Sequence, residues 1–361
     1  MLPYFIMVGI PALLSIGLVW LKTDERKLNR MTIDSFFAIW LTLLIFRSET
    51  VGIDVLVYKR NFQRYLFYSW SEIFTNVLDG EIEAGFVVIS KLLSYVTSNF
   101  RWMIIIAALI SVIPIWFLFR NEGKIGILAV AMFITVSPFA MFFSGLRQAM
   151  AMAFVAPCYY FCREKKIWHW LLMIFVAFLF HRSALILLFM YPVYHLRLKR
   201  EYHIAYILPI IGFVYLYKKP IFAFLLRFVG DYADEYADEF KETGAFAVTL
   251  LLAVLLIYAF IIVDPDKIDY DTMGLRNLMV LCAVLQVFSG VHTIAMRINY
   301  YYLILIPIAM SKIIKNANKK LGEIISFSVI CLTLFFTGYF FYHAYTDADI
   351  LRIYPYVWMF S

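Results

Sequence analysis

Charged residues are scarce in this chain. Asp, Glu, Lys and Arg make up 16% of its 361 residues, whereas they form about a quarter of a typical soluble domain. Hydrophobic residues reach 63%, and no segment between the apolar runs is long enough to form a soluble domain. The composition therefore excludes a soluble globular protein and predicts a single membrane domain over residues 1–361.

The chain also lacks the alternation of apolar and polar residues, over about ten positions, that marks the strands of an outer-membrane barrel. Its runs are apolar on every side, and they approach the roughly 20 residues that a helix needs to cross a bilayer. We therefore predict an all-α polytopic membrane protein. The first run, 2–21, has no basic segment before it and no small-residue cleavage site after it, so we expect a retained span.

Cysteine is rare as well. The four cysteines all fall within apolar runs, at Cys158, Cys162, Cys282 and Cys331. A cysteine in such a setting packs like a small hydrophobic residue. Their spacing shows neither a disulfide framework nor a metal-binding motif, so we expect no metal and no cofactor.

About twelve apolar runs are present, separated by short polar turns. We place the spans near residues 2–21, 33–46, 101–119, 126–143, 147–162, 167–180, 183–196, 202–217, 245–263, 278–295, 299–313 and 321–343. Alternate turns are compact and hold 18 of the 32 basic residues, namely Lys22, Arg26, Lys27, Arg30, Arg120, Lys124, Arg163, Lys165, Lys166, Arg197, Lys199, Arg200, Lys267, Arg276, Lys312, Lys315, Lys319 and Lys320. By the positive-inside rule these turns are cytoplasmic.

The opposite face carries two long segments, 47–101 and 218–244, which we expect to form an extracytoplasmic cap of amphipathic helices. Both chain termini fall on this face. Residues 84–98 are apolar, but the segment is short and has Lys91 in the middle. We therefore predict a helix that lies in the outer interface and does not cross the bilayer.

Two small polar clusters interrupt the apolar runs, at residues 144–148 and 181–183, and the basic turn 163–166 lies midway between them. A chain that descends from Arg147, turns and climbs back to His181 brings the two clusters to one level on adjacent helices. The spacing therefore predicts a site at the outer ends of these spans.

Several cations share that level. Arg47, Arg147, Arg182 and Arg297 come at the outer ends of spans, with His181 beside them. An arginine within hydrocarbon costs about 2.5–3.5 kcal/mol on insertion scales and tends to face a cavity, although a single helix-end arginine also reaches the headgroups by snorkelling. Several together favour an anionic, phosphate-bearing ligand, and the histidine suits a reaction that needs a proton acceptor.

Three other motifs each have a functional and a purely structural interpretation. Ser144-Gly145 lacks the nucleophile elbow or oxyanion turn that an intramembrane serine protease would need. The acidic and aromatic repeat at 231–240 is either a carbohydrate-facing helix or a solvated amphipathic one. Tyr300 and Tyr301 either belong to an aromatic belt or stack on sugar rings.

The chain resembles the EpsG family of Wzy-type polysaccharide polymerases over nearly its whole length. The segments that carry the resemblance are SETVGIDVLVYKRNF at 48–62, EAGFVVISKLL at 83–93, SGLRQAMAMAF at 144–154, FHRSALI at 180–186, Arg297 with Asn299-Tyr300-Tyr301, and Tyr354-Pro355-Tyr356. The Leu-Arg-Gln-Ala and Phe-His-Arg-Ser pair is the most specific part. One departure is Gly52-Ile53-Asp54-Val55, where the family more often has a run like Gly-Thr-Asp-Tyr.

The resemblance implies polymerisation of polyprenyl-diphosphate-linked repeat units of an exopolysaccharide, capsule or O-antigen at the outer face of the bacterial cytoplasmic membrane. In such a reaction, a hydroxyl of one lipid-linked unit attacks the anomeric carbon of another chain, and the polyprenyl diphosphate leaves. Arginine suits the diphosphate because it binds phosphate bidentately. We expect diphosphate contacts from Arg47, Arg147, Arg182 and Arg297.

The attacking hydroxyl must also lose a proton. We expect a neutral His181 to accept it, or failing that Asp54 or Glu83. Gln148, Tyr58, Tyr300 and Tyr301 are the expected sugar contacts. The implied partners are the lipid-linked glycan, the bilayer and other polysaccharide export components, and no nucleic acid.

Other classes of function stay open on the sequence. An O-antigen-ligase-like transferase, which moves the finished polymer to a different acceptor, is excluded by no residue. A transporter of the lipid-linked unit would need polar groups at the bilayer midplane, and the spans have few. A membrane acyltransferase would need its histidine on the cytoplasmic side, opposite to where our topology places His181.

Overall fold

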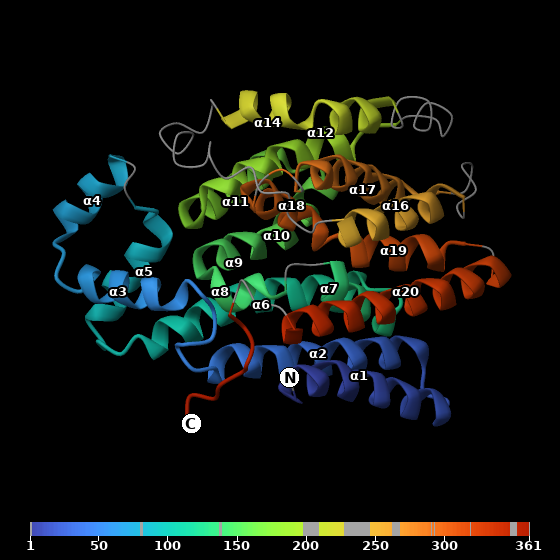
Figure 1. Ribbon diagram of the computed structural model, residues 1–361, viewed down its shortest axis with the longest axis horizontal. Coiled ribbons are helices and arrows are strands. Elements are labelled where there is room, and N and C mark those ends of the chain that lie inside the picture. Colours follow the sequence, from blue (N-terminus) through green and yellow to red (C-terminus); the bar gives the residue numbers. More distant parts are fainter. Residues whose placement is uncertain are drawn as a thin grey trace.

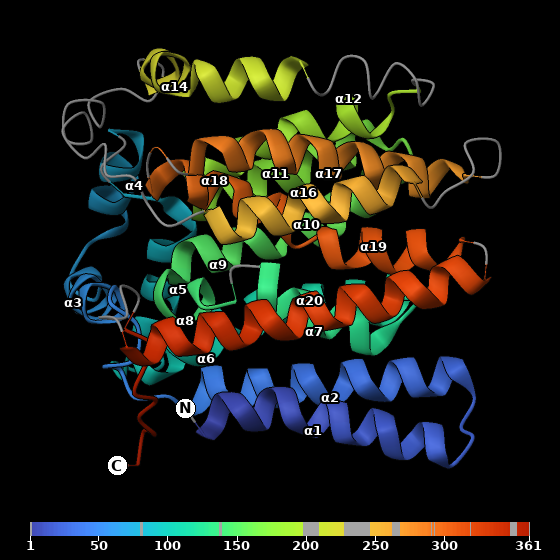
Figure 2. The same ribbon diagram turned by 45° about the vertical axis from the view of Figure 1, so that its right-hand side comes forward.

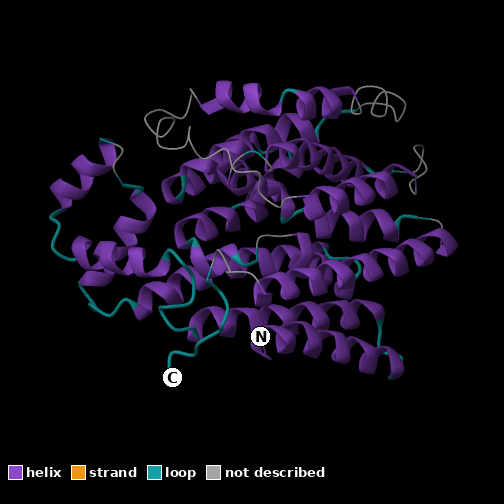
Figure 3. Cartoon of the chain, viewed as in Figure 1, coloured by secondary structure: helices purple, strands orange, loops and turns teal. Residues whose placement is uncertain are grey.

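A computed structural model describes residues 2–79, 82–136, 139–197, 209–226, 246–261, 268–289, 291, 293–317, 319–346 and 352–360. The elements in these ranges are helices joined by loops (Figure 3). The one extended pairing recorded among them is an isolated bridge between Arg47 and Trp358. The predicted all-α class is therefore confirmed for the described chain.

In the described part of the chain, five helices are long and apolar enough to cross a membrane. They are α1 (Leu2–Trp20), α2 (Glu25–Phe46), α6 (Arg101–Glu122), α17 (Tyr270–Ser289) and α20 (Lys319–Thr346). In Figures 1 and 2 these helices run roughly along one direction, with α1 and α2 at the bottom of the view and α17 in a higher layer. The protein is therefore a multi-pass membrane protein, and the number of twelve spans stays a prediction.

Most of the other predicted spans are built from shorter helices. The predicted runs 126–143, 147–162, 183–196 and 299–313 correspond to α7 (Gly126–Val136) with α8 (Met141–Ser144), α9 (Leu146–Ala153) with α10 (Val155–Arg163), the 3₁₀ helix η1 (Arg182–Phe189) with α12 (Met190–Tyr194), and α18 (Thr293–Leu303) with α19 (Ile306–Lys315). Two of the breaks precede a proline, Pro157 in α10 and Pro307 in α19. Proline has no N–H to donate to the preceding turn, so the helix is interrupted there.

The helix boundaries correct one expected position. We placed Arg297 in a turn between spans 278–295 and 299–313. Instead, α17 ends at Ser289 and α18 begins at Thr293, so Arg297 lies within α18. Our span boundaries missed the break after Ser289, although Gly290 and His292 mark it in the sequence, and the shift fixes the backbone of Arg297 in a helix.

The predicted cap segment 47–101 contains α3 (Val55–Tyr65), α4 (Trp70–Leu78) and α5 (Ala84–Ser94). Figure 1 shows all three at one end of the helix bundle, on the left of the view. At eleven residues, α5 is too short to span a bilayer. It packs against α3 and α11 (Ile167–Phe180). The position of this end relative to the membrane remains a prediction.

The second predicted cap segment is described only in part. Helix α14 (Lys218–Leu226) covers its beginning, and α16 (Phe246–Ile261) follows. The repeat at 231–240 lies outside the described residues, as do residues 202–208 of the predicted eighth span.

The C-terminal residues 352–360 run along the loop that follows α2. Backbone N–H groups of Ser48 and Gly52 donate to the carbonyls of Val357 and Arg352, each at 2.8 Å. The hydroxyl of Tyr4 donates to the carbonyl of Ile353 at 2.6 Å. These hydrogen bonds from the C-terminal segment therefore hold the loop that leads into α3 in place.

A buried ionic cluster lies at the end of the bundle away from α3–α5. We call it the basal network, and it consists of Glu122, Tyr159, Arg163, Tyr194, Asp271 and Lys312. The amine of Lys312 donates to both carboxylates and to the hydroxyl of Tyr159. The network thus joins the ends of α6, α10, α17 and α19 through two basic and two acidic groups.

Candidate functional site

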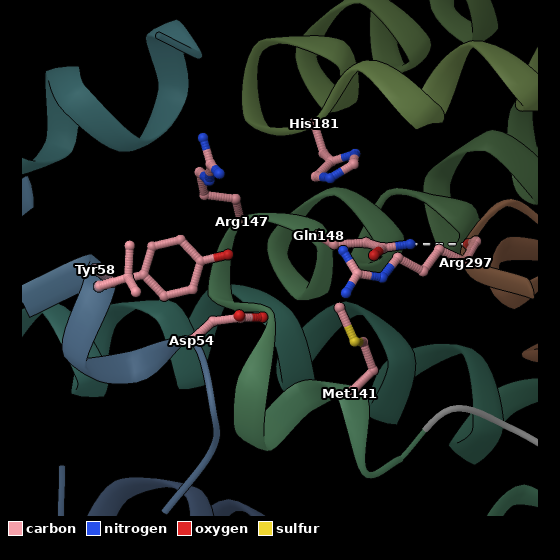
Figure 4. A pocket seen from close by; sticks show the side chains of 8 residues that line it. Asp54, Tyr58, Met141, Arg147, Gln148, His181 and Arg297 are labelled. Atoms are coloured by element: carbon pink, nitrogen blue, oxygen red, sulfur yellow. Dashed lines mark hydrogen bonds between the residues drawn. The ribbon is translucent and has the colours of Figure 1, made fainter. Parts of the chain in front are cut away.

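A pocket opens where α3, α8, α9, α18 and the junction between α11 and η1 meet (Figure 4). Its empty space is about 430 Å³, and it is lined by Asp54, Val57, Tyr58, Met141, Arg147, Gln148, His181 and Arg297. That figure includes space open to solvent, so the enclosed part of the pocket is smaller than typical ligand pockets of about 300–1,000 Å³. The pocket therefore suits the reacting centre of a substrate and not a whole oligosaccharide.

The loop between α2 and α3 brings Asp54 to the pocket. Gly52 has a φ of +104°, and a Cβ there would lie 2.1 Å from the carbonyl oxygen of Phe143. Only glycine fits this approach. Next to it, the backbone N–H of Asp54 donates to Ser144 Oγ at 3.4 Å, and that hydroxyl donates to Asp54 Oδ2 at 3.2 Å. Ser144 therefore orients the carboxylate.

Arg147 lies near the start of α9 and is paired with an acid. Its Nη1 is 2.8 Å from Oε2 of Glu83, and its guanidinium carbon lies 5.3 Å from the centre of the Tyr58 ring. Glu83 Oε1 also accepts the backbone N–H of Arg182 at 3.3 Å. Burial raises the pKa of Glu83, while the charge of Arg147 acts in the opposite direction. The charge of Arg147 is therefore largely balanced before any ligand binds.

Arg297 reaches the pocket from α18 without such a partner. Among the described residues, no acidic side chain lies within ion-pair distance of its guanidinium. Its backbone carbonyl accepts from Nε2 of Gln148 at 2.8 Å. The other end of that amide, Oε1, is buried with no hydrogen-bond partner in the described chain. The pocket thus contains a cation and an acceptor that are not used by the fold.

Asp54 and Arg297 lie on opposite sides of the pocket (Figure 4). Asp54, like Arg297, makes no ion pair with another described residue. His181 lies above the gap between Arg147 and Arg297. The arrangement offers a carboxylate at one side, a guanidinium at the other and an imidazole between them.

His181 is held at the break between α11 and η1. Its backbone is extended, with φ −158° and ψ 127°. Its Nδ1 accepts the backbone N–H of Ser183 at 3.2 Å and lies 2.7 Å from Ser183 Oγ. Ser183 Oγ is in turn 3.0 Å from the hydroxyl of Tyr301.

The other predicted site residues lie off the pocket. Arg47 is fully buried, donates to the carbonyl of Phe143 and lies against the Phe143 ring. Arg182 is exposed, and its backbone N–H contacts Glu83. Tyr300 is buried within α18. The structure therefore brings together Asp54, Tyr58, Arg147, Gln148, His181 and Arg297, with Glu83 directly behind them.

Sequence reasoning did not select four residues of this region. Val57 and Met141 line the pocket as apolar wall, and nothing in the sequence separates them from ordinary core residues. Ser144 and Ser183 orient Asp54 and His181. Both serines were visible inside the two polar clusters, so their position in the motifs was the available signal.

No group of three or more His, Cys, Asp or Glu side chains in the described ranges stands close enough to hold a metal ion. The polar groups of the pocket are guanidinium, amide, imidazole and carboxylate. Such a set suits hydrogen bonding to phosphate and hydroxyl groups.

The model of the EpsG family matches residues 32–358. No curated protein and no solved structure shows a significant match to the chain.

Proposed function

Because the chain belongs to the EpsG family, whose members are polysaccharide-polymerase-like membrane proteins, we propose that it polymerises polyprenyl-diphosphate-linked oligosaccharide repeat units. The product is an exopolysaccharide, a capsule or an O-antigen. The reaction takes place at the outer face of the bacterial cytoplasmic membrane. The pocket between α3, α9 and α18 is the active site.

One observation carries this proposal: Asp54 and Arg297 face the same pocket from opposite sides, and neither is in an ion pair with a described residue. A glycosyl transfer needs both groups. The base must stand where the attacking hydroxyl loses its proton, and the cation must stand where the leaving group becomes negative. A pocket built only to bind an anion would not need the carboxylate.

The reaction then proceeds as a displacement at the anomeric carbon. The hydroxyl oxygen of the lipid-linked acceptor forms the new C–O bond, and its proton passes to a pocket base, for which Asp54 is best placed. The bond between the anomeric carbon and the diphosphate oxygen breaks. The electron pair leaves with the diphosphate, whose charge is stabilised by Arg297 and Arg147.

Arg297 and Arg147 differ in this role. Arg147 already faces Glu83 at 2.8 Å, so a diphosphate must compete with a carboxylate for its hydrogen bonds. Arg297 has no such competitor among the described residues. We therefore propose Arg297 as the principal diphosphate contact, Arg147 as the second, and Tyr58 and Gln148 as contacts to the sugar.

The remaining predicted residues take indirect roles in this proposal. Glu83 holds Arg147 in place, and Tyr301 acts through Ser183. Arg182 stands at the rim, where its charge adds to the attraction for phosphate. Arg47 ties the loop before Asp54 to the carbonyl of Phe143, so it supports the site from behind.

The test uses a strain that makes the polymer and lacks this gene, complemented with variants at matched membrane levels. The strain without any complementing gene, called the empty strain below, should display single repeat units and no long chains. Arg297→Ala should do the same, and Arg297→Lys should restore little, because an ammonium loses the paired hydrogen bonds of a guanidinium.

Lys59→Ala is the matched control, since Lys59 carries the same charge near Asp54 but pairs with Glu49 at 2.5 Å, off the pocket. This variant should give the wild-type distribution of polymer chain lengths. Normal long chains from Arg297→Ala would contradict the proposal. Loss of all surface display from the empty strain, single repeats included, would point to transport in place of polymerisation.

A further inference from the structure

The imidazole of His181 has two ring nitrogens in different environments. Nδ1 faces Ser183, whose backbone N–H donates to it at 3.2 Å. Nε2 has no hydrogen-bond partner among the described residues. His181 lines the pocket, so Nε2 is the nitrogen that remains for a ligand.

The backbone N–H of Ser183 can only donate a hydrogen bond. Nδ1 must therefore present a lone pair, and it cannot carry a proton itself. A neutral imidazole has one N–H donor and one acceptor nitrogen. With Nδ1 as the acceptor, the proton lies on Nε2, and His181 offers the pocket an N–H donor.

Ser183 and Tyr301 strengthen this arrangement. Ser183 Oγ lies 2.7 Å from Nδ1 and 3.0 Å from the hydroxyl of Tyr301. Because Nδ1 is an acceptor, the Ser183 hydroxyl donates to it and accepts from Tyr301. Tyr301 is fully buried and follows Arg297 by one turn of α18. Helix α18 therefore supplies both the proposed diphosphate contact, Arg297, and the tyrosine that supports the hydrogen bonds of Ser183 and His181.

We infer that Tyr301 and Ser183 are positioning residues that hold His181 as an Nε2–H donor, and that His181 binds the departing diphosphate while Asp54 serves as the base. This deepens the proposed function and rests on it for the identity of the ligand. The role of His181 changes accordingly, from the proton acceptor expected on the sequence to a hydrogen-bond donor.

The proton balance of the reaction fits this assignment. The hydroxyl proton of the acceptor goes to the carboxylate of Asp54. The diphosphate leaves with the electron pair of the broken C–O bond and needs no proton, only donors. Nε2–H of His181 and the guanidinium of Arg297 supply these donors in the same part of the pocket.

The first test measures the tautomer directly and does not depend on the function. The protein is purified in lipid nanodiscs with ¹⁵N-labelled histidine, and the signal of His181 is assigned among the six histidines by its loss in His181→Gln. An unprotonated Nδ1 and a protonated Nε2 are expected at neutral pH. The opposite tautomer, or a doubly protonated ring, would overturn the inference while leaving the proposed polymerase intact.

The second test separates donor from base in the complemented strain. Gln at position 181 keeps an N–H donor, whereas Glu offers a carboxylate base. His181→Gln should therefore retain more long-chain polymer than His181→Glu. We expect long-chain polymer to fall roughly 10-fold in His181→Gln and more than about 100-fold in His181→Glu. More polymer from His181→Glu than from His181→Gln would show that His181 is the base.

The third test addresses the positioning residues. Tyr301→Phe should shift the ¹⁵N signals of His181 and lower long-chain polymer by roughly 10-fold. Tyr302→Phe is the matched control, because the adjacent tyrosine is equally buried and loses a hydrogen bond of 2.7 Å to the carbonyl of Ile186. It should leave the His181 signals unchanged. Equal spectra and equal polymer for the two variants would contradict the positioning role.

Discussion

Two clusters of charged residues lie at opposite ends of the helix bundle, and they differ in how far the fold satisfies their hydrogen bonds. In the basal network the amine of Lys312 contacts two carboxylates, and Arg163 lies 2.8 Å from Glu122. None of its buried side-chain polar atoms lacks a hydrogen-bond partner. In the pocket, Nε of Arg147 and Oε1 of Gln148 do lack one in the described chain.

The difference indicates what each cluster is for. A buried polar group without a partner costs about 1–3 kcal/mol, and of these two clusters only the pocket bears that cost among the described residues. The basal network holds helix ends together, whereas the pocket keeps its polar groups available for a ligand. We therefore expect substitutions in the basal network to lower stability and substitutions in the pocket to lower activity.

The two clusters should also face opposite sides of the membrane, which gives an all-or-none prediction. In a chain whose native cysteines are replaced by alanine, Ser71→Cys in α4 should react with an impermeant thiol reagent in intact cells. Glu164→Cys, in the turn near the basal network, should react only after the membrane is opened. Reversed labelling would remove the outer-face assignment of the pocket.

The largest effect on activity is expected at Asp54. Asp54→Asn keeps the size of the side chain and removes the base, so long-chain polymer formation should fall by about 100-fold to 10,000-fold. Its thermal unfolding in detergent should stay within a few degrees of the wild type. A matched fall in membrane level would show that Asp54 serves the fold and not the reaction.

The largest effect on stability is expected at Lys312. Lys312→Ala leaves the buried carboxylate of Glu122 and the partly buried carboxylate of Asp271 with one cation fewer. Breaking a buried ion pair in this way costs about 3–5 kcal/mol. The measurement is the unfolding temperature and the membrane level of the variant. Lys315→Ala is the control, because its pair with Glu25 is exposed and such pairs contribute only about 0–1 kcal/mol.

The smallest effect is expected at Glu83. Burial raises its pKa above the usual 4.5, so the folded state binds this proton more tightly than the unfolded chain does. Glu83 therefore favours folding below the unfolded pKa and loses that contribution as pH rises through the folded pKa. The unfolding temperature of Glu83→Gln, relative to wild type, should rise as the pH increases from the usual pKa of 4.5 toward neutral. A difference that stays constant over this range would contradict the raised pKa.

The sequence predicted the class of the fold because that class depends on composition. An excess of apolar residues on all sides of each run requires helices in a bilayer, where backbone groups must pair within the segment. Composition did not predict the positions at which helices break within the apolar runs. Pro157 and Pro307 interrupt helices whose hydropathy is continuous. Arg297 lies within α18 because the break between helices comes after Ser289, several residues earlier than we placed it.

The site was predictable as far as it depends on spacing along the chain. Arg147, Gln148 and His181 meet because a descending and an ascending segment of similar length return to one level, and the motif order alone indicates this. Arg297 and Asp54 join them across gaps of more than a hundred and about ninety residues. No local pattern specifies such a meeting.

The sequence by itself determined that this protein is an all-helical membrane protein with basic turns and a few polar residues grouped near span ends. Only the tertiary structure decided which charges are paired. Arg147 and Arg297 look alike in the sequence and both line the pocket, yet Arg147 pairs with Glu83 and Arg297 has no acidic partner among the described residues. Ser183, which sets the tautomer of His181 in our proposal, lies 3.0 Å from the hydroxyl of Tyr301, a residue more than a hundred positions away. Composition and hydropathy act locally, whereas pairing and protonation depend on distances of a few ångströms between segments that only packing brings together.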